Sequence, residues 1–562
     1  MRTLDWIIFA AYLIYIIGLG SYRSRGSRDT RDYFLAGRSL PWWMIGLSVM
    51  ATQASAITFI GTTGLGYEEG MRFVQFYFGL PVAMVILCVT LVPLFYRAKV
   101  YTAYEYLEQR FDAKTRLLTS ILFLISRGLA LGIVVYAPSV VLAILLGWDI
   151  WATVLIMAVA ATIYTVVGGI RAVIWTDVQQ MILIAVGMFL CVVIIYAKLP
   201  DDVSLLGALK LAGSTDRLQP IDFSFDLTEK YTFWSGLFAG TFLMLSYFGC
   251  DQSQVQRYLT SRSLRDSRLA LLFNAFLKVP MQFFILFIGV LLFAFYQFEK
   301  PPLAFDDSGP RAVRQSDFSA EYDQLETRYD AAFEKRKQAA REFLQREQTD
   351  NAESSQQALS AYSASNKELA DIRQQSAGVI KKATGKSYKD TNYIFPRFVI
   401  HHLPVGLVGL IIAAVFAAAM SSMDSELNSL STTSVIDIYR RHLKPDADER
   451  HYLKASRVCT VIWAVIAGSF AMYAGALGSV IEAVNIVGSY FYGSLLGVFV
   501  LAVCVKRANG NGAFWGLLAG MTAVCVASLT TDIAFLWFNI VGCAAVVAVG
   551  FLLRGPAKES PQ

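Results

Sequence analysis

The sequence predicts an all-α integral membrane protein with about thirteen transmembrane helices, each long and apolar enough to span a bilayer. Three observations support this fold class. Hydrophobic residues make up 55% of the 562-residue chain and charged residues only 16%, whereas soluble domains average about 25% charged residues. Apolar runs such as 134–148, 181–197 and 269–296 recur along the chain. Between them, loops rich in basic residues alternate with loops that are acidic or poor in basic residues.

The alternation of loop charge predicts the topology. Lysine and arginine crowd the loops at 23–38, 97–116, 171, 257–268, 440–457 and 506–507, and they are scarcer at 68–69, 149, 200–230, 482 and 532. Because basic loops stay on the cytoplasmic side, we expect the N-terminus outside, the C-terminus in the cytoplasm and a bacterial inner membrane as the location. The net charge of +6 is divided among these short loops, so no nucleic-acid partner is expected.

The first apolar run, at 4–22, is expected to be the first span. It has neither the basic leader nor the small-residue cleavage site that is typical of a signal peptide. The seven cysteines lie at or near apolar runs without the spacing of a disulfide framework or a metal site. We interpret them as small core residues.

A polar segment at 301–392 interrupts the apolar pattern. Glu, Lys, Gln and Ala dominate it, and spaced Tyr, Phe and Leu residues follow a helical period. We expect an extracellular helical hairpin, broken near 349–351. Two interpretations remain open for it: a solvated decoration of the loop, or an element that docks a protein partner or captures substrate.

A stretch rich in small and hydroxyl residues lies in the second expected span, at 48–66. Its three glycines weaken a continuous helix, and an unwound stretch would free backbone carbonyls that can coordinate a cation. The same composition fits a packing face of the GxxxG type between helices. The residues alone leave both interpretations open.

A second polar cluster lies at 417–429, in the ninth expected span. Ser421, Ser422 and Ser425 fall on neighbouring faces at helical spacing, with Asp424 beside them. Hydroxyl and carbonyl oxygens suit a hard cation such as sodium, which favours an ion site over hydroxyls that bond back to their own helix. Asp177, at the start of the sixth span, fits either a helix cap or the negative charge of a cation site, and taken alone the cap is preferred.

Several function classes lack their motifs. The chain has no phosphate-binding P-loop, no HExxH and no GxSxG, and it has only four histidines. We therefore expect neither an enzyme nor an ATP-driven pump, and no cofactor. No repeated selectivity-filter element of a channel is visible either.

Five ordered motifs resemble the sodium:solute symporter family, which includes sodium-coupled galactose, sialic acid, proline, glucose, iodide and monocarboxylate carriers. The motifs lie at 32–43 with 51–61, at 168–177, at 251–259, at 417–429 and at 488–493. The resemblance covers nearly everything except the polar insert. It implies a LeuT-type core of two five-helix inverted repeats, with binding sites at broken helices near the bilayer midplane.

This resemblance implies a division of the chain. The segments are 1–40 for an extra N-terminal transmembrane helix and a cytoplasmic loop, 41–300 for the first part of the transporter core, 301–392 for the extracellular insert, 393–507 for the rest of the core, and 508–562 for two C-terminal transmembrane helices and a short cytoplasmic tail.

The resemblance also implies ion-binding residues. The family's main sodium site matches Ala51 and Ala54, through their backbone carbonyls, and Ala418, Ser421 and Ser422. A second sodium site, present in some members, matches Asp177, Ser421, Asp424 and Ser425. Asp424 places a carboxylate where the family has a hydroxyl, so the sodium stoichiometry and the participation of a proton stay open.

The substrate residues implied by the resemblance are Gln53, Ser55, Thr58, Gln75, Arg127, Tyr247, Lys278 and Asn485. Tyr247 matches an inner-gate tyrosine and Lys278 a pocket lysine of the sugar symporters. The remaining sugar-binding positions carry Met244, Thr58 and Tyr77. Since an unpaired hydroxyl in a dry pocket costs about 1–3 kcal/mol, a galactose-type pocket is not expected.

The pattern at 53–58 looks closer to the sialic acid and monocarboxylate branches. Arg127 points the same way, because an arginine at membrane depth usually faces a cavity and pairs with an anion; the alternative is that Arg127 snorkels to the inner surface. We expect sodium-coupled symport of a small organic solute that bears a carboxylate. A sugar or polyol symporter, a transporter-fold sensor and a channel are the alternatives.

Overall fold

The computed structural model describes residues 2–23, 29–146, 148–347, 352–473 and 480–554. Within these ranges, ten helices are long and apolar enough to cross a membrane, and one bent helix pair forms a further candidate span. Two shorter apolar helices cover Ile150–Ile163 and Ser235–Gly249. No strand is found in the described ranges. The predicted all-α membrane class is therefore confirmed.

The long helices and their continuations are α1 (Thr3–Arg23), α3 (Trp42–Gln53), α4 (Ala56–Glu68), α5 (Gly79–Val89), α6 (Leu91–Ala98), α8 (Ala113–Leu146), α9 (Ile150–Ala197), α11 (Gly240–Gly249), α13 (Leu264–Phe295), α18 (Leu407–Thr433), α19 (Glu449–Ala471), α20 (Val480–Cys504), α21 (Gly510–Thr530) and α22 (Phe538–Leu552). Short helices join them: α2 (Thr30–Leu35), α7 (Ala103–Arg110), α10 (Leu205–Gly213), α12 (Gln252–Tyr258) and α17 (Ile394–His402). The polar insert holds α14 (Ser308–Arg314), α15 (Ser319–Glu347) and α16 (Ala352–Thr384). Irregular helical turns occur at Arg72–Tyr77, Ser235–Ala239 and Ser434–Leu443.

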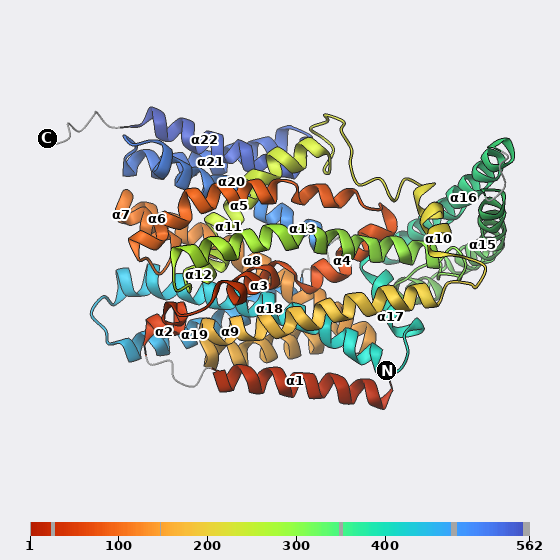
Figure 1. The fold of residues 1–562 in the computed structure, drawn as a ribbon, viewed down its shortest axis with the longest axis horizontal. Coiled ribbons are helices and arrows are strands. Elements are labelled where there is room, and N and C mark those ends of the chain that lie inside the picture. Colours follow the sequence, from red (N-terminus) through yellow and green to blue (C-terminus); the bar gives the residue numbers. More distant parts are fainter. Residues whose placement is uncertain (1, 24–28, 147, 348–351, 474–479, 555–562) are drawn as a thin grey trace.

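The long helices run side by side as one bundle (Figure 1). α18 lies in its middle: nearly every residue from Ala413 to Thr433 is buried, and α18 packs against α1, α3, α8, α9 and α19. The pair α21 and α22 packs against α20 at one edge, and α1 packs against α9 and α18 at another. The hydroxyl-rich stretch at 417–429 is thus at the centre of the bundle.

A glycine divides α9 into two spans. Gly169 has φ +56° and ψ −167°, a conformation that residues with a Cβ rarely adopt. The apolar segments Ile150–Ile163 and Gly168–Ala197 lie on its two sides, as the sequence predicts for the fifth and sixth spans. Asp177 consequently lies more than two turns inside the second segment, so the interpretation of Asp177 as a helix cap is wrong.

Close backbone contact holds α4 against α13. A Cβ on Gly289 would lie 2.2 Å from the Thr63 carbonyl oxygen and 2.8 Å from the Gly66 Cα. Neither atom can move without shifting a helix backbone. We expect Gly289→Ala to lower the apparent melting temperature of the purified protein, since overpacking of this kind costs about 1–3 kcal/mol.

Gly378 supplies the control for this prediction, because a Cβ there meets nothing within 4 Å. We expect Gly378→Ala, within α16, to leave the melting temperature unchanged or to raise it slightly through helix propensity. Equal losses in the two variants would contradict the packing argument.

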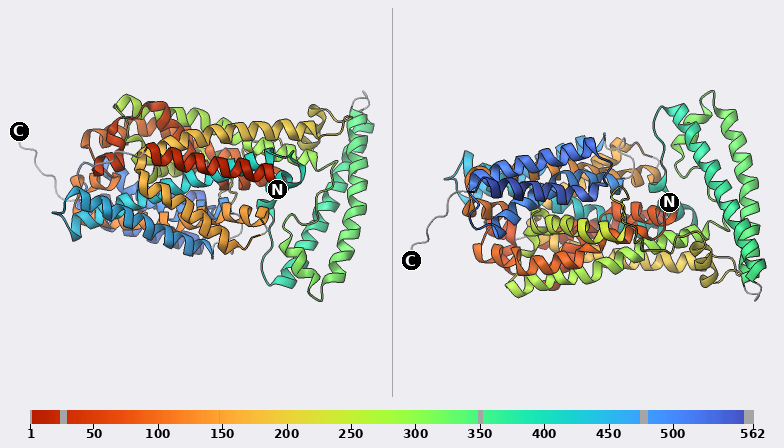
Figure 2. Two further views of the ribbon diagram at one scale, coloured as in Figure 1. Left: turned by 90° about the horizontal axis from the view of Figure 1, so that it is seen from below. Right: turned by 90° about the horizontal axis from the view of Figure 1, so that it is seen from above.

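Two long helices of the insert, α15 and α16, pack against each other. α15 and α16 stand across one end of the bundle (Figure 2), and their apolar faces meet in a small core that includes Tyr329, Phe333, Leu369 and Ile372. The predicted break at 349–351 lies outside the described residues. The short α14 is an addition that the sequence pattern did not predict.

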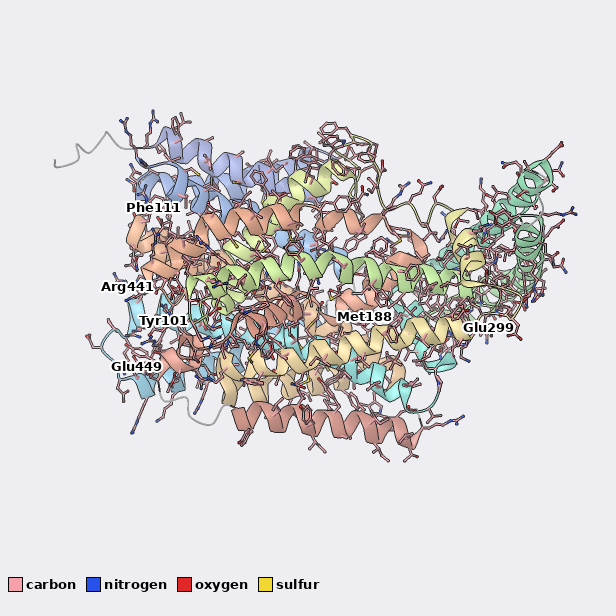
Figure 3. All side chains as sticks on the ribbon, in the orientation of Figure 1. Tyr101, Phe111, Met188, Glu299, Arg441 and Glu449 are labelled. Carbon is pink, nitrogen blue, oxygen red and sulfur yellow. The ribbon has the colours of Figure 1, made fainter. Side chains whose placement is uncertain are left out.

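Two of the basic loops and the start of the insert lie at opposite ends of the bundle. One end carries residues of two basic loops, Tyr101, Phe111, Arg441 and Glu449 (Figure 3). The other end carries Glu299, at the start of the insert. α1 begins at the end that carries the insert, and α22 ends at the opposite one (Figure 1).

Candidate functional site

The helix of the hydroxyl-rich stretch at 48–66 is broken. α3 ends at Gln53 and α4 begins at Ala56, with Ala54 at φ −91° and ψ 63° and Ser55 at φ −73° and ψ 169°. The two halves are bent by 59° relative to each other. No side-chain hydrogen bond caps the start of α4. The interpretation as an unwound span therefore fits the geometry better than a continuous packing face.

Ser422 of α18 meets the broken helix. Its Oγ donates to the Thr52 carbonyl oxygen (3.1 Å) and to the Ala418 carbonyl oxygen (3.3 Å). The Thr52 hydroxyl lies 3.2 Å from Ser425 Oγ. The five residues that match the family's main sodium site are all buried at this junction of α3 and α18: Ala51, Ala54, Ala418, Ser421 and Ser422. Carbonyl and hydroxyl oxygens are the ligands that such a hard cation prefers.

Asp177 of α9 joins α3 and α18 through two short hydrogen bonds. Ser48 Oγ donates to one carboxylate oxygen and Ser421 Oγ to the other, both at 2.5 Å. Ser425 Oγ donates to the Asp424 carboxylate at 3.1 Å. The structure therefore links Asp177 with Ser421, and Asp424 with Ser425, among the residues predicted for the second site.

Arg257 of α12 enters the same cluster, and sequence reasoning missed it. Its guanidinium lies 3.7 Å from an Asp177 oxygen, donates through Nε to Ser48 Oγ at 3.0 Å and bonds Ser425 Oγ. The side chain is fully buried. A fixed positive charge thus already faces the carboxylate that the second sodium site would use.

A small cavity of about 90 Å³ lies beside the break in the helix. Six of the predicted substrate residues line it: Gln53, Ser55, Thr58, Arg127, Tyr247 and Asn485. Aromatic and aliphatic side chains complete its wall, among them Phe76, Tyr77, Val134 and Leu243.

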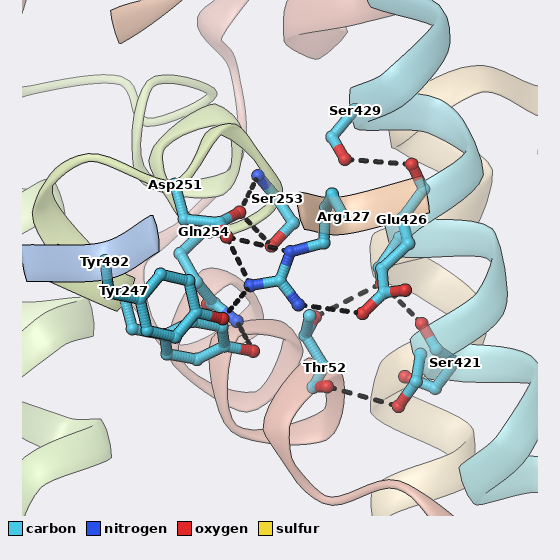
Figure 4. A network of polar contacts seen from close by, with 12 residues as sticks. Thr52, Arg127, Tyr247, Asp251, Ser253, Gln254, Ser421, Glu426, Ser429 and Tyr492 are labelled. Carbon is cyan, nitrogen blue, oxygen red and sulfur yellow. Dashed lines mark hydrogen bonds and ion pairs between the residues drawn. The ribbon is translucent and has the colours of Figure 1, made fainter. Parts of the chain in front are cut away.

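Arg127 of α8 holds a buried polar network at this cavity (Figure 4). Its Nε donates to Asp251 at 2.8 Å, its Nη1 to Glu426 at 3.0 Å and its Nη2 to the Tyr492 hydroxyl at 2.5 Å, while Nη2 also pairs with Asp251. The guanidinium lies 5.2 Å from the centre of the Tyr247 ring. Arg127 is only 3% exposed, so the alternative that it snorkels to the inner surface is wrong.

Sequence reasoning missed Asp251, Glu426 and Tyr492 as site residues. Asp251 and Glu426 stand in the 251–259 and 417–429 motifs, but they lie 124 and 299 positions from Arg127. The second carboxylate oxygen of Glu426, a cavity-lining residue, has no hydrogen-bond partner among the described residues. With both carboxylates ionised, one arginine therefore faces two negative charges.

Two of the predicted substrate residues lie away from the cavity lining. Gln75 sits on a tight helical turn, and its amide donates to the Tyr231 carbonyl at 2.8 Å and accepts from the Asp222 backbone at 2.8 Å. Lys278 of α13 is fully buried, with its Nζ 5.7 Å from the centre of the Tyr77 ring. Since Tyr77 lines the cavity, Lys278 lies behind its wall.

A broken helix and a polar cavity inside an apolar bundle define the class of protein: a secondary transporter, in which unwound backbone binds ions and solute. A model of the sodium:solute symporter family matches residues 33–309 and 372–520. The chain belongs to this family and is a sodium-coupled symporter. The family and its relatives are transporters and not enzymes.

Individual relatives agree with this assignment. The chain is 28% identical to the sodium/sialic acid symporter NanT of Aliivibrio fischeri, over 99% of this chain and 94% of the relative. It is also 28% identical to the human sodium-coupled monocarboxylate transporter 1, over 92% of this chain and 72% of the relative. A solved structure of a substrate-bound, outward-open Na⁺-coupled sialic acid symporter matches with a TM-score of 0.77 and 26% identity, covering 99% of both chains.

Proposed function

We propose that the transported solute is a small organic carboxylate of the sialic acid or monocarboxylate type. The observation that carries this proposal is Arg127 in the wall of the cavity that the broken helix also lines. A guanidinium binds a carboxylate through two parallel N–H donors. The names of the two sialic acid symporters and of the monocarboxylate transporters among the relatives support the same solute class.

Glu426 is the partner of Arg127 that an entering solute would displace. Its carboxylate occupies Arg127 Nη1 at 3.0 Å, whereas Asp251 is also fixed by the Ser253 backbone and hydroxyl, at 2.8 and 2.6 Å. Glu426 is thus the less constrained of the two partners. A solute carboxylate would displace Glu426 from Nη1 and the Tyr492 hydroxyl from Nη2, and would leave the Arg127–Asp251 pair in place.

The mechanism that we infer is alternating access in a LeuT-type core of two five-helix repeats. Sodium at Ala51, Ala54, Ala418, Ser421 and Ser422 would order the broken helix and complete the solute cavity. We retain the second ion site at Asp177, Ser421, Asp424 and Ser425. The positive charge of Arg257 would compete with the cation there. After the outer side closes, solute would leave past Tyr247, whose hydroxyl accepts from Gln254 at 2.8 Å.

The membrane arrangement belongs to this proposal. We count the apolar helices, the bent pair and the two shorter helices as the thirteen spans of this scheme. We place the insert and the N-terminus outside and the C-terminus in the cytoplasm of a bacterial inner membrane. Residues 41–300 and 393–507 form the transporter core in this scheme, with the segments 1–40, 301–392 and 508–562 added to it. Gln75 and Lys278 would act behind the solute cavity and not on the solute.

Thermal stabilisation of the detergent-purified protein tests the solute class. A ligand that binds the folded state raises its apparent stability by mass action. We expect N-acetylneuraminate or lactate to raise the melting temperature in sodium but not in potassium. A sodium-dependent rise with galactose alone would retain the symporter and reject the carboxylate.

Ser422 tests the main sodium site. We expect Ser422→Ala to reduce sodium-dependent uptake at least tenfold, which corresponds to about 1.4 kcal/mol of lost ion binding. Ser429→Ala is the matched control, because among the described residues Ser429 Oγ bonds only to the Glu426 carbonyl of its own helix (2.9 Å). Unchanged uptake and sodium dependence in Ser422→Ala would remove Ser422 from the site.

A further inference from the structure

A second, larger cavity lies between the insert and the end of α4, apart from the solute cavity. It measures about 400 Å³, which falls within the range of small-molecule sites. Four basic residues line it, Arg217, Arg336, Arg373 and Lys389, against the two acidic residues Glu68 and Asp390. Its lining is therefore positively charged overall.

The arginines differ in how they are neutralised. Arg373 forms two hydrogen bonds of 3.1 Å to the Asp390 carboxylate. Arg217 donates to the main-chain carbonyls of Tyr67 (2.9 Å) and Glu68 (3.2 Å), and Arg336 donates to the Tyr296 carbonyl (2.6 Å).

In the described part of the chain, no carboxylate forms an ion pair with Arg217 or with Arg336. Burial lowers the pKa of the Arg217 guanidinium. Burial also disfavours the charged form of Arg373, but the negative charge of Asp390 outweighs this and raises its pKa. Among the described residues, Arg217 and Arg336 thus lack the close carboxylate partner that Arg373 has, although the Glu68 carboxylate partly offsets the effect of burial on the pKa of Arg217.

Two hydrogen-bond donors at this cavity are unused. Arg336 Nε and Asn366 Nδ2 are buried atoms without a partner among the described residues, and both residues line the cavity. Arg336 is 5% exposed. Buried donors are normally satisfied by protein, water or a ligand. Unused donors beside unneutralised arginines are the arrangement that an anion completes.

We propose that this cavity, which we call the vestibule, is an anion-binding site in which the insert captures a carboxylate solute before transport. α4 connects it to the solute cavity: Thr58 lines the inner cavity and Tyr67 the vestibule, and the helix between them rises about 1.5 Å per residue, or roughly 14 Å in all. Anion binding in the vestibule stands alone, whereas the capture of a transported solute rests on the proposed function. The family match omits residues 310–371, the part of the insert that contributes Arg336 and Asn366 to the lining.

Direct binding tests the vestibule without transport. We would titrate the full-length Ser422→Ala protein, in phosphatidylcholine nanodiscs and in potassium buffer, with N-acetylneuraminate and lactate. We expect sodium-independent binding that weakens as ionic strength rises. Asn366→Asp, which adds a negative charge with little change of volume, and Arg336→Gln should each weaken it at least fivefold.

Arg314→Gln is the matched control, because Arg314 is exposed and pairs with Glu326 on the insert at 3.1 Å. It should leave binding unchanged. Weakening by Arg314→Gln equal to that by Arg336→Gln would overturn the proposal, as would an absence of sodium-independent binding. Nanodiscs that contain phosphatidylglycerol test whether a lipid headgroup is the anion that binds. Binding of that lipid in the vestibule, together with no solute binding in phosphatidylcholine nanodiscs, would also overturn the proposal.

Uptake separates the vestibule from the proposed function. In proteoliposomes, Asn366→Asp should raise the half-saturating solute concentration at least fivefold and leave the maximal rate within twofold of the original. A fivefold fall in the maximal rate, with an unchanged half-saturating concentration, would contradict capture. If no carboxylate were transported but sodium-independent binding persisted, the proposed function would fail and the anion site would stand.

Discussion

Replacing Arg127 by glutamine is expected to abolish sodium-driven uptake and to destabilise the protein. The substitution removes the donors that hold Asp251, Glu426 and the Tyr492 hydroxyl. Breaking a buried ion pair by removing one partner costs about 3–5 kcal/mol, because the remaining charge stays buried without a counter-charge. Two carboxylates are left here, so we expect a fall of several degrees in melting temperature together with an uptake loss of about 100-fold, a factor that corresponds to about 2.7 kcal/mol.

A neutralised triple variant separates stability from solute binding. Arg127→Gln combined with Asp251→Asn and Glu426→Gln removes all three charges, and we expect it to recover much of the stability but no uptake. Arg127→Lys keeps the charge but loses the planar fork, so its uptake should be intermediate. A triple variant that transported carboxylates at the original rate would show that Arg127 has only a structural role.

Replacing Asp177 by asparagine is the second substitution with a large expected effect. Asp177 accepts hydrogen bonds from Ser48 and Ser421 and faces the buried Arg257. An asparagine cannot balance that positive charge, and the uncompensated arginine again costs about 3–5 kcal/mol. We expect apparent sodium affinity to fall at least tenfold, measured as the sodium dependence of initial uptake.

A second variant decides whether Asp177 serves the ion or only Arg257. In Asp177→Asn with Arg257→Gln, both charges are removed, so the stability lost through the unpaired arginine should return. If Asp177 contributes to a sodium site, sodium affinity stays low in this double variant. Recovery of the original sodium dependence would show that Asp177 acts only as the partner of Arg257.

The sequence at 48–66 offers a break as one of two interpretations, because small and hydroxyl residues can favour either unwinding or close packing. The break lies at Ala54 and Ser55, whereas the three glycines lie inside α4. The hydroxyl face of α18 is a local signal, since Ser421, Ser422 and Ser425 follow helical spacing. In both segments the residues that suggest a site are neighbours in the sequence.

The charge network could not be predicted in the same way. Arg257 meets Asp177 because α12 packs against α3 and α18, and Glu426 meets Arg127 across 299 positions. Hydropathy and spacing describe one helix at a time and carry no information on such pairs. Gln75 is a further example: the 3₁₀ turn at Arg72–Tyr77 changes the helical phase, so its amide bonds a loop and not the cavity.

The vestibule could not be predicted from the sequence pattern either. The helical period of the insert predicts its hairpin, but Arg217 comes from the segment before α11, Arg336 from α15 and Arg373 from α16. Only the folded arrangement places these three arginines around one cavity.

Uptake by the purified protein in proteoliposomes, under an imposed inward sodium gradient, tests the central claim most directly. With potassium outside as the control, radiolabelled N-acetylneuraminate and lactate would be compared with galactose. We predict that a carboxylate accumulates above its external concentration only in the sodium gradient, and that Ser422→Ala removes this accumulation. Carboxylate entry that merely equilibrates, at the same rate in sodium and potassium, would contradict sodium-coupled symport of a carboxylate.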